Sequence, residues 1–245
     1  MEMFKNMNFF IHTRDLDKYD IIKPSAILEF FQDIAGIHAD ELGIGYETCK
    51  QKNLAWVVLY QRFEIVKIPP SLTNVNVKTW PKPKERLEFQ REYLIEDLDG
   101  QTLVKGISNW VVIDLVSRNL VRTDKIDFNG EYYNYTNYNQ KSKRKLSLDD
   151  KLIENYFTYK VQYDDLDHNG HMNNAKYLNI VYNNLGDIKS YVKNLEIAYI
   201  KEAKIDDCLK IGMYKVESQY FYIGFLNDEK CFECIIGVEK IWTNF

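Results

Sequence analysis

The chain repeats one order of apolar and polar positions. Residues 4–13 and 156–163 are typical of strands, and apolar residues at helical spacing then predict helices over about 24–42 and 174–188. Strand-like segments follow each helix, at about 54–68, 72–80, 86–97 and 101–116, and again at 194–204, 208–217, 218–226 and 230–243. A long amphipathic helix followed by antiparallel strands predicts an α+β fold in which a sheet wraps around the helix.

The two patterns are related by a constant shift of 150 residues. The tripeptide Asp15-Leu16-Asp17 recurs as Asp165-Leu166-Asp167. A repeat of this length predicts a duplicated domain rather than a solenoid. We therefore expect an N-terminal half over residues 1–123, a C-terminal half over 151–245, and a linker or crossover over 124–150, where apolar periodicity is weak.

A group of polar residues precedes the second predicted helix. Asp167, Asn169 and His171 occupy alternate positions, so in an extended segment their side chains would share one face and point into one cleft. Asn173 and Asn174 follow, and both suit the N-cap of a helix, whose free amides favour a negative charge such as a developing oxyanion. An alternative is that Asn169 and His171 only complete a turn, because Asp-His-Asn-Gly is typical of turns.

The first half lacks this set of polar residues. At the shift of 150 residues, Tyr19 stands at the position of Asn169 and Ile21 at that of His171, while the aspartate occurs in both halves. The architecture therefore does not require the amide and the imidazole. We expect one active site per chain, in the second half.

Composition narrows the class of protein. The 245 residues are 45% hydrophobic and 28% charged, which is typical of a globular protein. A net charge of −4 argues against nucleic-acid binding by the protein as a whole and leaves a local basic patch as an alternative. No secretory signal is visible in the sequence and there is no apolar run of about 20 residues, so we expect a cytoplasmic protein without a membrane span. Cysteines at 49, 208, 231 and 234 predict reduced thiols, because side chains at 231 and 234 of a strand point to opposite faces.

The motif Asp167-x-Asn169-x-His171-x-Asn173-Asn174-x-x-Tyr177 resembles the signature of acyl-acyl carrier protein thioesterases, which are double hotdog proteins of plants and bacteria. The resemblance extends to His38–Gly43, Trp110–Asp114 and Tyr199–Glu202, and so spans most of the chain. It implies a tandem (double) hotdog fold. It also implies hydrolysis of a fatty acyl thioester on the phosphopantetheine arm of acyl carrier protein.

The same resemblance implies a catalytic set of Asp167, Asn169, His171 and Glu202. Family members often have a cysteine just after this glutamate; here the residue is Ala203, which favours an attacking water. Thioester hydrolysis needs a base, a means to orient water and donors for the oxyanion. We hypothesise that Glu202 and His171 activate water, and that Asn169 positions the water or the carbonyl group. Asp167 would orient Asn169 and His171, and amides at the start of the second helix would bind the oxyanion.

The acyl chain, the partner and the oligomeric state follow as further expectations. Candidate walls of an acyl tunnel are aromatic and aliphatic residues of the first half: Tyr19, Ile21, Phe30, Phe31, Trp56 and Trp80. An acidic carrier protein would dock on basic clusters, and Lys82–Arg86 and Lys141–Lys145 are the candidates. No metal or cofactor is expected beyond the phosphopantetheine of the substrate. The fused halves already form a pseudo-dimer, so the chain is expected to be a monomer or a homodimer.

Other activities fit the same residues. An acyl-CoA thioesterase would use the same set with a different carrier. A dehydratase of hydroxyacyl thioesters would also use a histidine with a carboxylate, although the Asn-x-His-x-Asn-Asn pattern fits it less well. A non-catalytic acyl-binding regulator would usually carry a DNA-binding module, and no helix-turn-helix pattern precedes residue 14.

Overall fold

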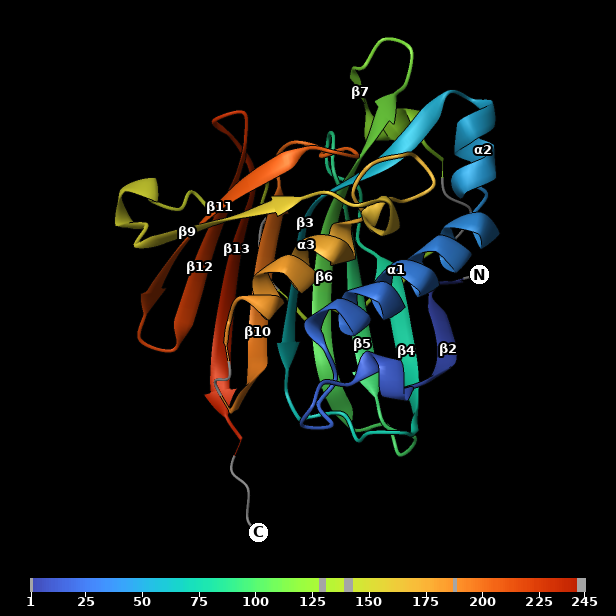
Figure 1. The fold of residues 1–245 in the computed structure, drawn as a ribbon. Helices are drawn as coiled ribbons and strands as arrows, with labels where there is room; N and C mark the ends of the chain where they lie inside the picture. Colours follow the sequence, from blue (N-terminus) through green and yellow to red (C-terminus); the bar gives the residue numbers. More distant parts are fainter. Residues whose placement is uncertain (1, 128–130, 139–142, 187–188, 242–245) are drawn as a thin grey trace. The chain divides into compact units, whose positions relative to one another are not determined.

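The computed structural model describes residues 2–127, 131–138, 143–186 and 189–241. The chain folds as two compact units, Met1–Ser142 and Lys143–Phe245, here called unit 1 and unit 2 (Figure 1). The boundary falls within the predicted linker. No helix in the described part of the chain is long and apolar enough to cross a membrane.

Unit 1 is an antiparallel sheet with a long helix on one face. Its helices are α1 (Pro24–Glu41) and α2 (Tyr46–Gln51), and its strands are β1 (Glu2–Met3), β2 (Lys5–Phe10), β3 (Leu54–Ile65), β4 (Asn74–Pro81), β5 (Phe89–Glu96), β6 (Thr102–Asp114), β7 (Leu120–Val121) and β8 (Glu131–Tyr132). The main sheet has the order β2-β4-β5-β6-β3, and β7 pairs with β6. Strands β1 and β8 form a separate parallel pair.

The periodicity of α1 explains its packing. Pro24 opens the helix, where a missing amide hydrogen costs nothing, and Ile27, Phe31 and Ile34 are buried on its inner face. The Phe31 ring lies over Gly106 of β6, because a Cβ at that glycine would stand 2.2 Å from the ring. Gly43, with φ at +76°, follows the end of the helix, where a left-handed residue is common.

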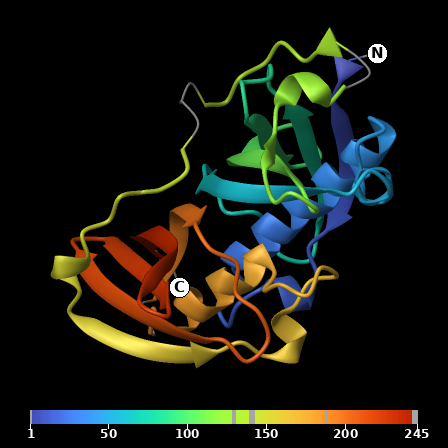
Figure 2. The ribbon, with the colours of Figure 1, turned by 90° about the horizontal axis from the view of Figure 1, so that it is seen from above.

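Unit 2 has the same construction. Its helix is α3 (Asn174–Asn183), and its strands are β9 (Asn155–Lys160), β10 (Ser190–Tyr199), β11 (Cys208–Val216), β12 (Gln219–Leu226) and β13 (Glu229–Lys240). The antiparallel order is β10-β13-β12-β11-β9. Seen from above, this sheet curves so that α3 lies in its hollow (Figure 2).

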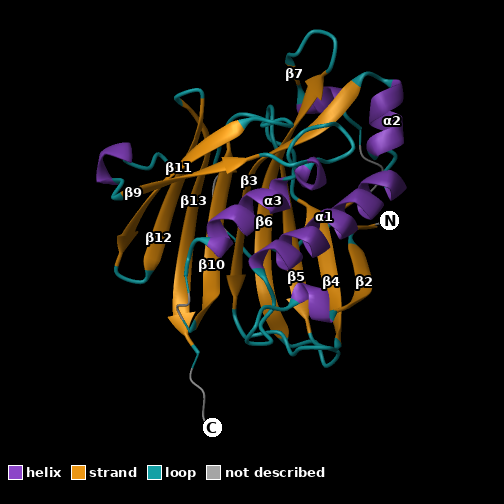
Figure 3. Ribbon diagram, viewed as in Figure 1, coloured by secondary structure: helices purple, strands orange, loops and turns teal. Residues whose placement is uncertain are grey.

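The predicted duplication is confirmed. Strands β2 and β9 are displaced by 150 residues, α1 and α3 begin 150 residues apart, and a short 3-10 turn precedes each helix, at Thr13–Asp15 and Tyr163–Asp165. The strand order of one unit matches that of the other (Figure 3). Three details differ from prediction: α3 ends at Asn183 rather than near 188, β10 covers Ser190–Tyr199 rather than 194–204, and α2 was not predicted. Residues 187 and 188 lie outside the described residues.

The predicted linker is more ordered on unit 1 than its composition suggests. Backbone amides of Asn137 and Tyr138 donate to the Glu92 carboxylate, at 2.5 and 3.4 Å. Glu92 is fully buried on the sheet, and Lys82 pairs with it at 3.0 Å. A buried carboxylate must be hydrogen-bonded, so these contacts hold this segment on unit 1.

A second buried carboxylate holds the other end of the linker on unit 2. Glu233 of β13 is 1% exposed and accepts backbone hydrogen bonds from Leu146, Ser147 and Leu148, at 2.8, 2.9 and 3.1 Å. Lys230 pairs with the same carboxylate at 2.9 Å. The sequence of the linker did not predict these contacts, because Glu92 and Glu233 lie far from it in the chain.

Candidate active site

The polar residues before α3 form a turn rather than an extended segment. The Asp167 carboxylate accepts the backbone amides of Asn169 and His171 at 2.8 and 3.2 Å, and the Asp167 amide donates to the His171 carbonyl at 2.8 Å. Gly170 adopts φ of +77°, which a residue without Cβ accepts readily. The expectation that alternate residues share one extended face was therefore wrong, because the aspartate folds the segment back on itself.

The same turn occurs in unit 1 without the carboxamide and imidazole side chains. The Asp17 carboxylate accepts the amides of Tyr19 and Ile21 at 2.8 and 3.1 Å, and Asp20 takes the left-handed position with φ of +57°. The aspartate shared by both halves thus has a structural role in each turn. Because the aspartate makes the same hydrogen bonds in both turns, the presence of Asp167 does not by itself indicate catalysis.

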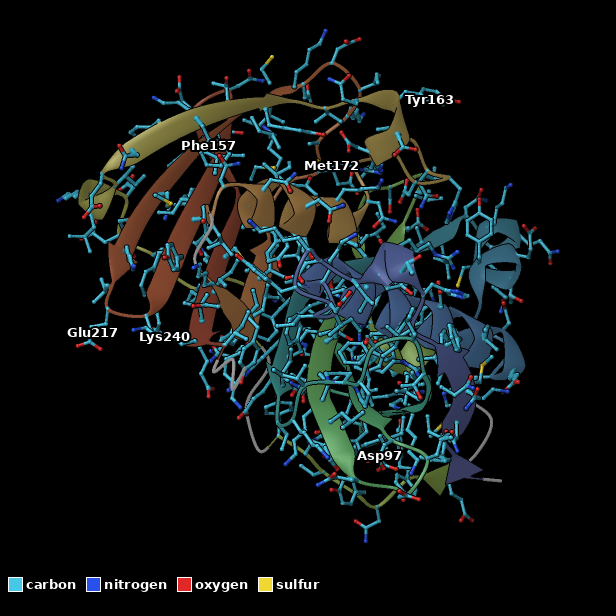
Figure 4. The ribbon with its side chains drawn as sticks, turned by 60° about the horizontal axis from the view of Figure 1, so that its bottom comes forward. Asp97, Phe157, Tyr163, Met172, Glu217 and Lys240 are labelled. Atoms are coloured by element: carbon cyan, nitrogen blue, oxygen red, sulfur yellow. The ribbon has the colours of Figure 1, made fainter. Side chains whose placement is uncertain are left out.

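His171 and Glu202 lie together at the entry to α3. The His171 Nε2 atom is 3.3 Å from Glu202 Oε2, and their side chains are 24% and 36% exposed. The backbones of His171 and Lys204 form an isolated antiparallel β-bridge. The backbone amide of Met172 donates to the Ala203 carbonyl at 2.8 Å. Met172 lies near the 3-10 turn that contains Tyr163 (Figure 4). Backbone pairing therefore brings residues that are 31 positions apart into contact.

Asn169 lies on the exposed side of the turn. Its Nδ2 is 3.4 Å from Asp167 Oδ2, so the same carboxylate that holds its backbone also orients its carboxamide. The structure thus joins the predicted residues as two pairs, Asp167 with Asn169 and His171 with Glu202. Asp167 links the pairs through the backbone amide of His171.

The start of α3 corrects part of the oxyanion prediction. Asn173 is the N-cap, as predicted, and its side-chain oxygen accepts the Ala175 amide at 2.9 Å. The Lys176 amide donates to the Asn173 carbonyl, and the Asn174 carbonyl accepts from the Tyr199 hydroxyl at 3.0 Å. The amides of Ala175 and Lys176 are therefore already used within the helix. Among the amides predicted as oxyanion donors, that of Asn173 is also used, because it donates to the Asp165 carbonyl at 2.8 Å, which leaves the Asn174 amide.

Cys231 and Tyr177 contact the residues on either side of Glu202, and the sequence indicated Cys231 only as one of four reduced thiols. The Cys231 thiol donates to the Lys201 carbonyl at 3.0 Å and lies 4.0 Å from the Tyr177 hydroxyl. Burial raises the pKa of this thiol to about 11, so it stays protonated at neutral pH. All four cysteines are free, and no cluster of three or more His, Cys, Asp or Glu side chains in the described ranges could hold a metal ion.

The predicted tunnel residues of unit 1 lie in different surroundings. Ile21, just before α1, and Phe30 and Phe31, within α1, are buried, while Tyr19 is 37% exposed on its turn. Trp56 packs on Phe89 and donates its indole N–H to the Ile44 carbonyl at 2.8 Å.

Trp80, predicted as a tunnel residue, lies on the face of the sheet away from α1. Tyr93 of β5 stacks on Phe31 of α1, with ring centroids 4.3 Å apart, and Trp80 pairs with the residue before Tyr93. Because successive strand residues alternate faces, Trp80 points away from α1. There it packs against Tyr133 and Tyr135, at 5.5 and 5.6 Å.

The predicted docking clusters are also partly occupied. Lys82 is 18% exposed and binds Glu92, and the Lys84 ammonium donates to the Ile126 carbonyl. Lys143 pairs with Glu196 at 2.8 Å, and Lys141 lies outside the described residues. Intramolecular contacts thus already use Lys82, Lys84 and Lys143, three of the lysines predicted to dock a partner.

His38, which the sequence left out of the site, is a buried member of unit 1. It is 2% exposed, and its Nδ1 accepts a hydrogen bond from Arg91 at 2.9 Å. Burial and the neighbouring guanidinium lower the pKa of His38 to about 4. The imidazole is therefore neutral and structural at physiological pH.

Family models match both halves of the chain. The model of the acyl-ACP thioesterase N-terminal domain matches residues 2–129, and that of the C-terminal domain matches residues 149–230. The crystal structure of an acyl-ACP thioesterase from Bacteroides thetaiotaomicron is 21% identical, with a TM-score of 0.83 over 97% of this chain and 98% of that one. This likeness shows the fold, an α+β double hotdog.

Curated plant proteins are also similar. An oleoyl-acyl carrier protein thioesterase of Coriandrum sativum is 25% identical over 201 residues, which are 74% of this chain and 54% of that protein. A palmitoyl-acyl carrier protein thioesterase of Arabidopsis thaliana is 28% identical over 186 residues, or 72% of this chain and 45% of that protein. The chain thus spans about half the length of these curated relatives.

Proposed function

The chain belongs to the acyl-ACP thioesterase family, and from this premise we propose that it hydrolyses fatty acyl thioesters of acyl carrier protein. The products are a free fatty acid and the carrier protein with a free phosphopantetheine thiol. The observation that carries the proposal is the 3.3 Å approach of His171 Nε2 to Glu202 Oε2 beside the N-terminus of α3. A histidine with a carboxylate is suited to removing a proton from water.

His171 acts as the general base in the proposed reaction. Glu202 holds the Nε2 side of the imidazole, which leaves Nδ1 to accept a proton as the water oxygen bonds to the acyl carbon. The tetrahedral intermediate then collapses, the carbon–sulfur bond breaks, and the imidazolium returns its proton to the departing sulfur. Water is the nucleophile, because residue 203 is a buried alanine without a thiol and the Cys231 thiol is protonated.

Asn169 and Asp167 have supporting roles. The Asn169 carboxamide positions the water or the thioester carbonyl, and the oxyanion is stabilised by donors at the entry to α3. Asp167 fixes the turn by accepting the amides of Asn169 and His171, so it orients both side chains without touching the substrate. Unit 1 has Tyr19 and Ile21 at the equivalent places, so each chain has one active site.

The acyl chain is proposed to bind on the α1 side of the unit 1 sheet. Ile21, Phe30, Phe31 and Trp56 supply apolar surface there, whereas Trp80 lies on the other face. No cofactor is needed in this scheme beyond the phosphopantetheine carried by the substrate. The depth of this apolar surface would set the preferred length of the acyl chain, which hydrolysis rates on substrates of several chain lengths would measure.

The test is free-thiol release from acyl carrier protein loaded with chains of several lengths. His171→Ala should lower the hydrolysis rate by about 10²- to 10⁴-fold, the usual worth of a positioned acid–base group. His168→Ala is the matched control, because this exposed histidine lies three residues earlier in the same turn and should leave turnover nearly unchanged.

Other outcomes would redirect the assignment. Faster release from acyl-CoA than from acyl carrier protein would make CoA esters the substrate. Loss of water from a hydroxyacyl thioester without thiol release would indicate a dehydratase. Acyl binding with no reaction on any of these thioesters would indicate a binding protein and contradict the proposal.

A further inference from the structure

The backbone on both sides of Glu202 is held by neighbouring elements of unit 2. The amides of Ile200 and Lys201 donate to the Cys231 carbonyl, at 2.8 and 3.0 Å. On the other side, the Met172 amide donates to the Ala203 carbonyl at 2.8 Å. The strand β10 has ended at Tyr199, so these bonds replace regular sheet pairing at the point where Glu202 lies.

The Cys231 side chain adds a third bond to this segment. Its Sγ lies 3.0 Å from the Lys201 carbonyl, the group directly before Glu202 in the chain. The thiol is fully buried in the core, and its raised pKa of about 11 keeps it an S–H donor rather than a thiolate. Cys231 therefore holds the Lys201 peptide through its backbone carbonyl and through its side chain.

Tyr177 supports the same segment from α3. Its ring is 3% exposed and packs edge-on against Tyr199 and Phe232, with centroids 5.6 and 5.2 Å away. Its hydroxyl lies 4.0 Å from Cys231 Sγ and faces the backbone of Ala203, whose amide stabilises the oxygen. The Tyr177 hydroxyl and the Cys231 thiol thus both contact the backbone next to Glu202.

We propose that Cys231 and Tyr177 are positioning residues that hold Glu202 against His171. They touch the 200–203 backbone and not the reacting atoms. Because catalytic groups must be held within a few tenths of an ångström of their working geometry, a shift of this backbone would weaken the contact between His171 and Glu202. The inference rests on the proposed hydrolysis only for its kinetic readout.

The first test compares Cys231→Ala with Cys231→Ser in the full chain. Alanine removes the donor to the Lys201 carbonyl, so kcat on acyl carrier protein should fall by about tenfold while KM changes little. Serine replaces the S–H donor by an O–H donor and should restore most of kcat. The pH–rate profile of the alanine variant should also move toward that of Glu202→Gln, a change that lost packing alone would not produce.

The second test uses Tyr177→Phe with two matched controls. Tyr222 is also buried in unit 2, but its hydroxyl has no hydrogen-bond partner within the described residues, so Tyr222→Phe should preserve kcat. Cys234→Ala removes a second fully buried thiol of β13, which pairs with Ile197 of β10 rather than with the 200–203 segment, and should preserve kcat as well. Tyr177→Phe should lower kcat by several-fold with little change in KM.

A third readout separates this inference from the proposed function. Nitrogen NMR of the neutral His171 imidazole reports which ring nitrogen carries the proton. The Cys231→Ala and Tyr177→Phe variants should shift that tautomer balance in the direction seen in Glu202→Gln, whether or not the wild-type chain hydrolyses a thioester. Unchanged tautomer balance and pH profile in folded Cys231→Ala and Tyr177→Phe proteins would overturn the positioning role. Should Cys231→Ala not fold, the tautomer balance and pH profile of Tyr177→Phe give the decision.

Discussion

Phe31 and Gly106 show how one residue sets the distance between a helix and its sheet. The Phe31 ring stacks on Tyr93 at 4.3 Å and occupies the space where a Cβ of residue 106 would stand. Gly106→Ala should destabilise unit 1 by about 1–3 kcal/mol, because the ring or the strand must move in a closely packed core. Chemical denaturation of the variant measures the effect.

Gly36 is the control for this prediction. It lies on the exposed face of α1 with nothing within 4 Å of an added Cβ, so Gly36→Ala should stabilise the chain by about 0.5–1 kcal/mol. Equal and small effects at both positions would mean that the space over β6 is not tightly filled.

At the scale of elements, the aspartate turn and the helix after it form one unit that the chain uses twice. Asp17→Ala and Asp167→Ala each remove an acceptor of two backbone amides, so each should cost about 1 kcal/mol of folding free energy. Only Asp167→Ala should also slow hydrolysis, by about 10²-fold, since its turn orients His171. Paired denaturation and activity measurements check both statements.

The outcome at Asp17 decides between one active site and two. The conservative Asp17→Asn variant retains an acceptor oxygen and should leave folding and turnover nearly unchanged. A loss of turnover as severe as that of His171→Ala, with folding and substrate binding intact, would mean that unit 1 carries chemistry as well.

At the scale of the whole molecule, buried ionisable groups determine the response to acid. His38 has a pKa of about 4 in the folded chain against 6.5 for the free side chain. Its contribution to stability is fully present above pH 6.5, decreases as pH falls because the unfolded chain binds the proton first, and is lost below pH 4. The predicted loss over this window is at most about 3 kcal/mol.

A substitution isolates this contribution. His38→Gln retains a hydrogen-bond acceptor for Arg91 but does not titrate, so its free energy of unfolding should depend less steeply on pH between 6.5 and 4. Denaturation curves of both proteins across this range give the comparison. Identical slopes would show that other groups, and not His38, govern acid unfolding.

Local patterns in the sequence were sufficient for the elements and their duplication. Alternation with a period of two gave the strands, helical spacing gave α1 and α3, and the shift of 150 residues located the equivalent turns. These features depend on short-range geometry, which each stretch of chain carries within itself. The motif around His171 predicts the candidate site in the second half, because its equivalent positions in the first half hold Tyr19 and Ile21, and this location stays a prediction.

Only the tertiary structure decided which groups meet. The fold of the Asp167 turn, the side of the sheet on which Trp80 lies, and the buried glutamates that hold the linker all depend on partners remote in sequence. So does the contact of Cys231 with the backbone next to Glu202, which arises from pairing of β13 with the chain after β10. Periodicity specifies which face of an element is apolar, but register and chain crossing specify what that face contacts, and these are set by the packing of the complete unit.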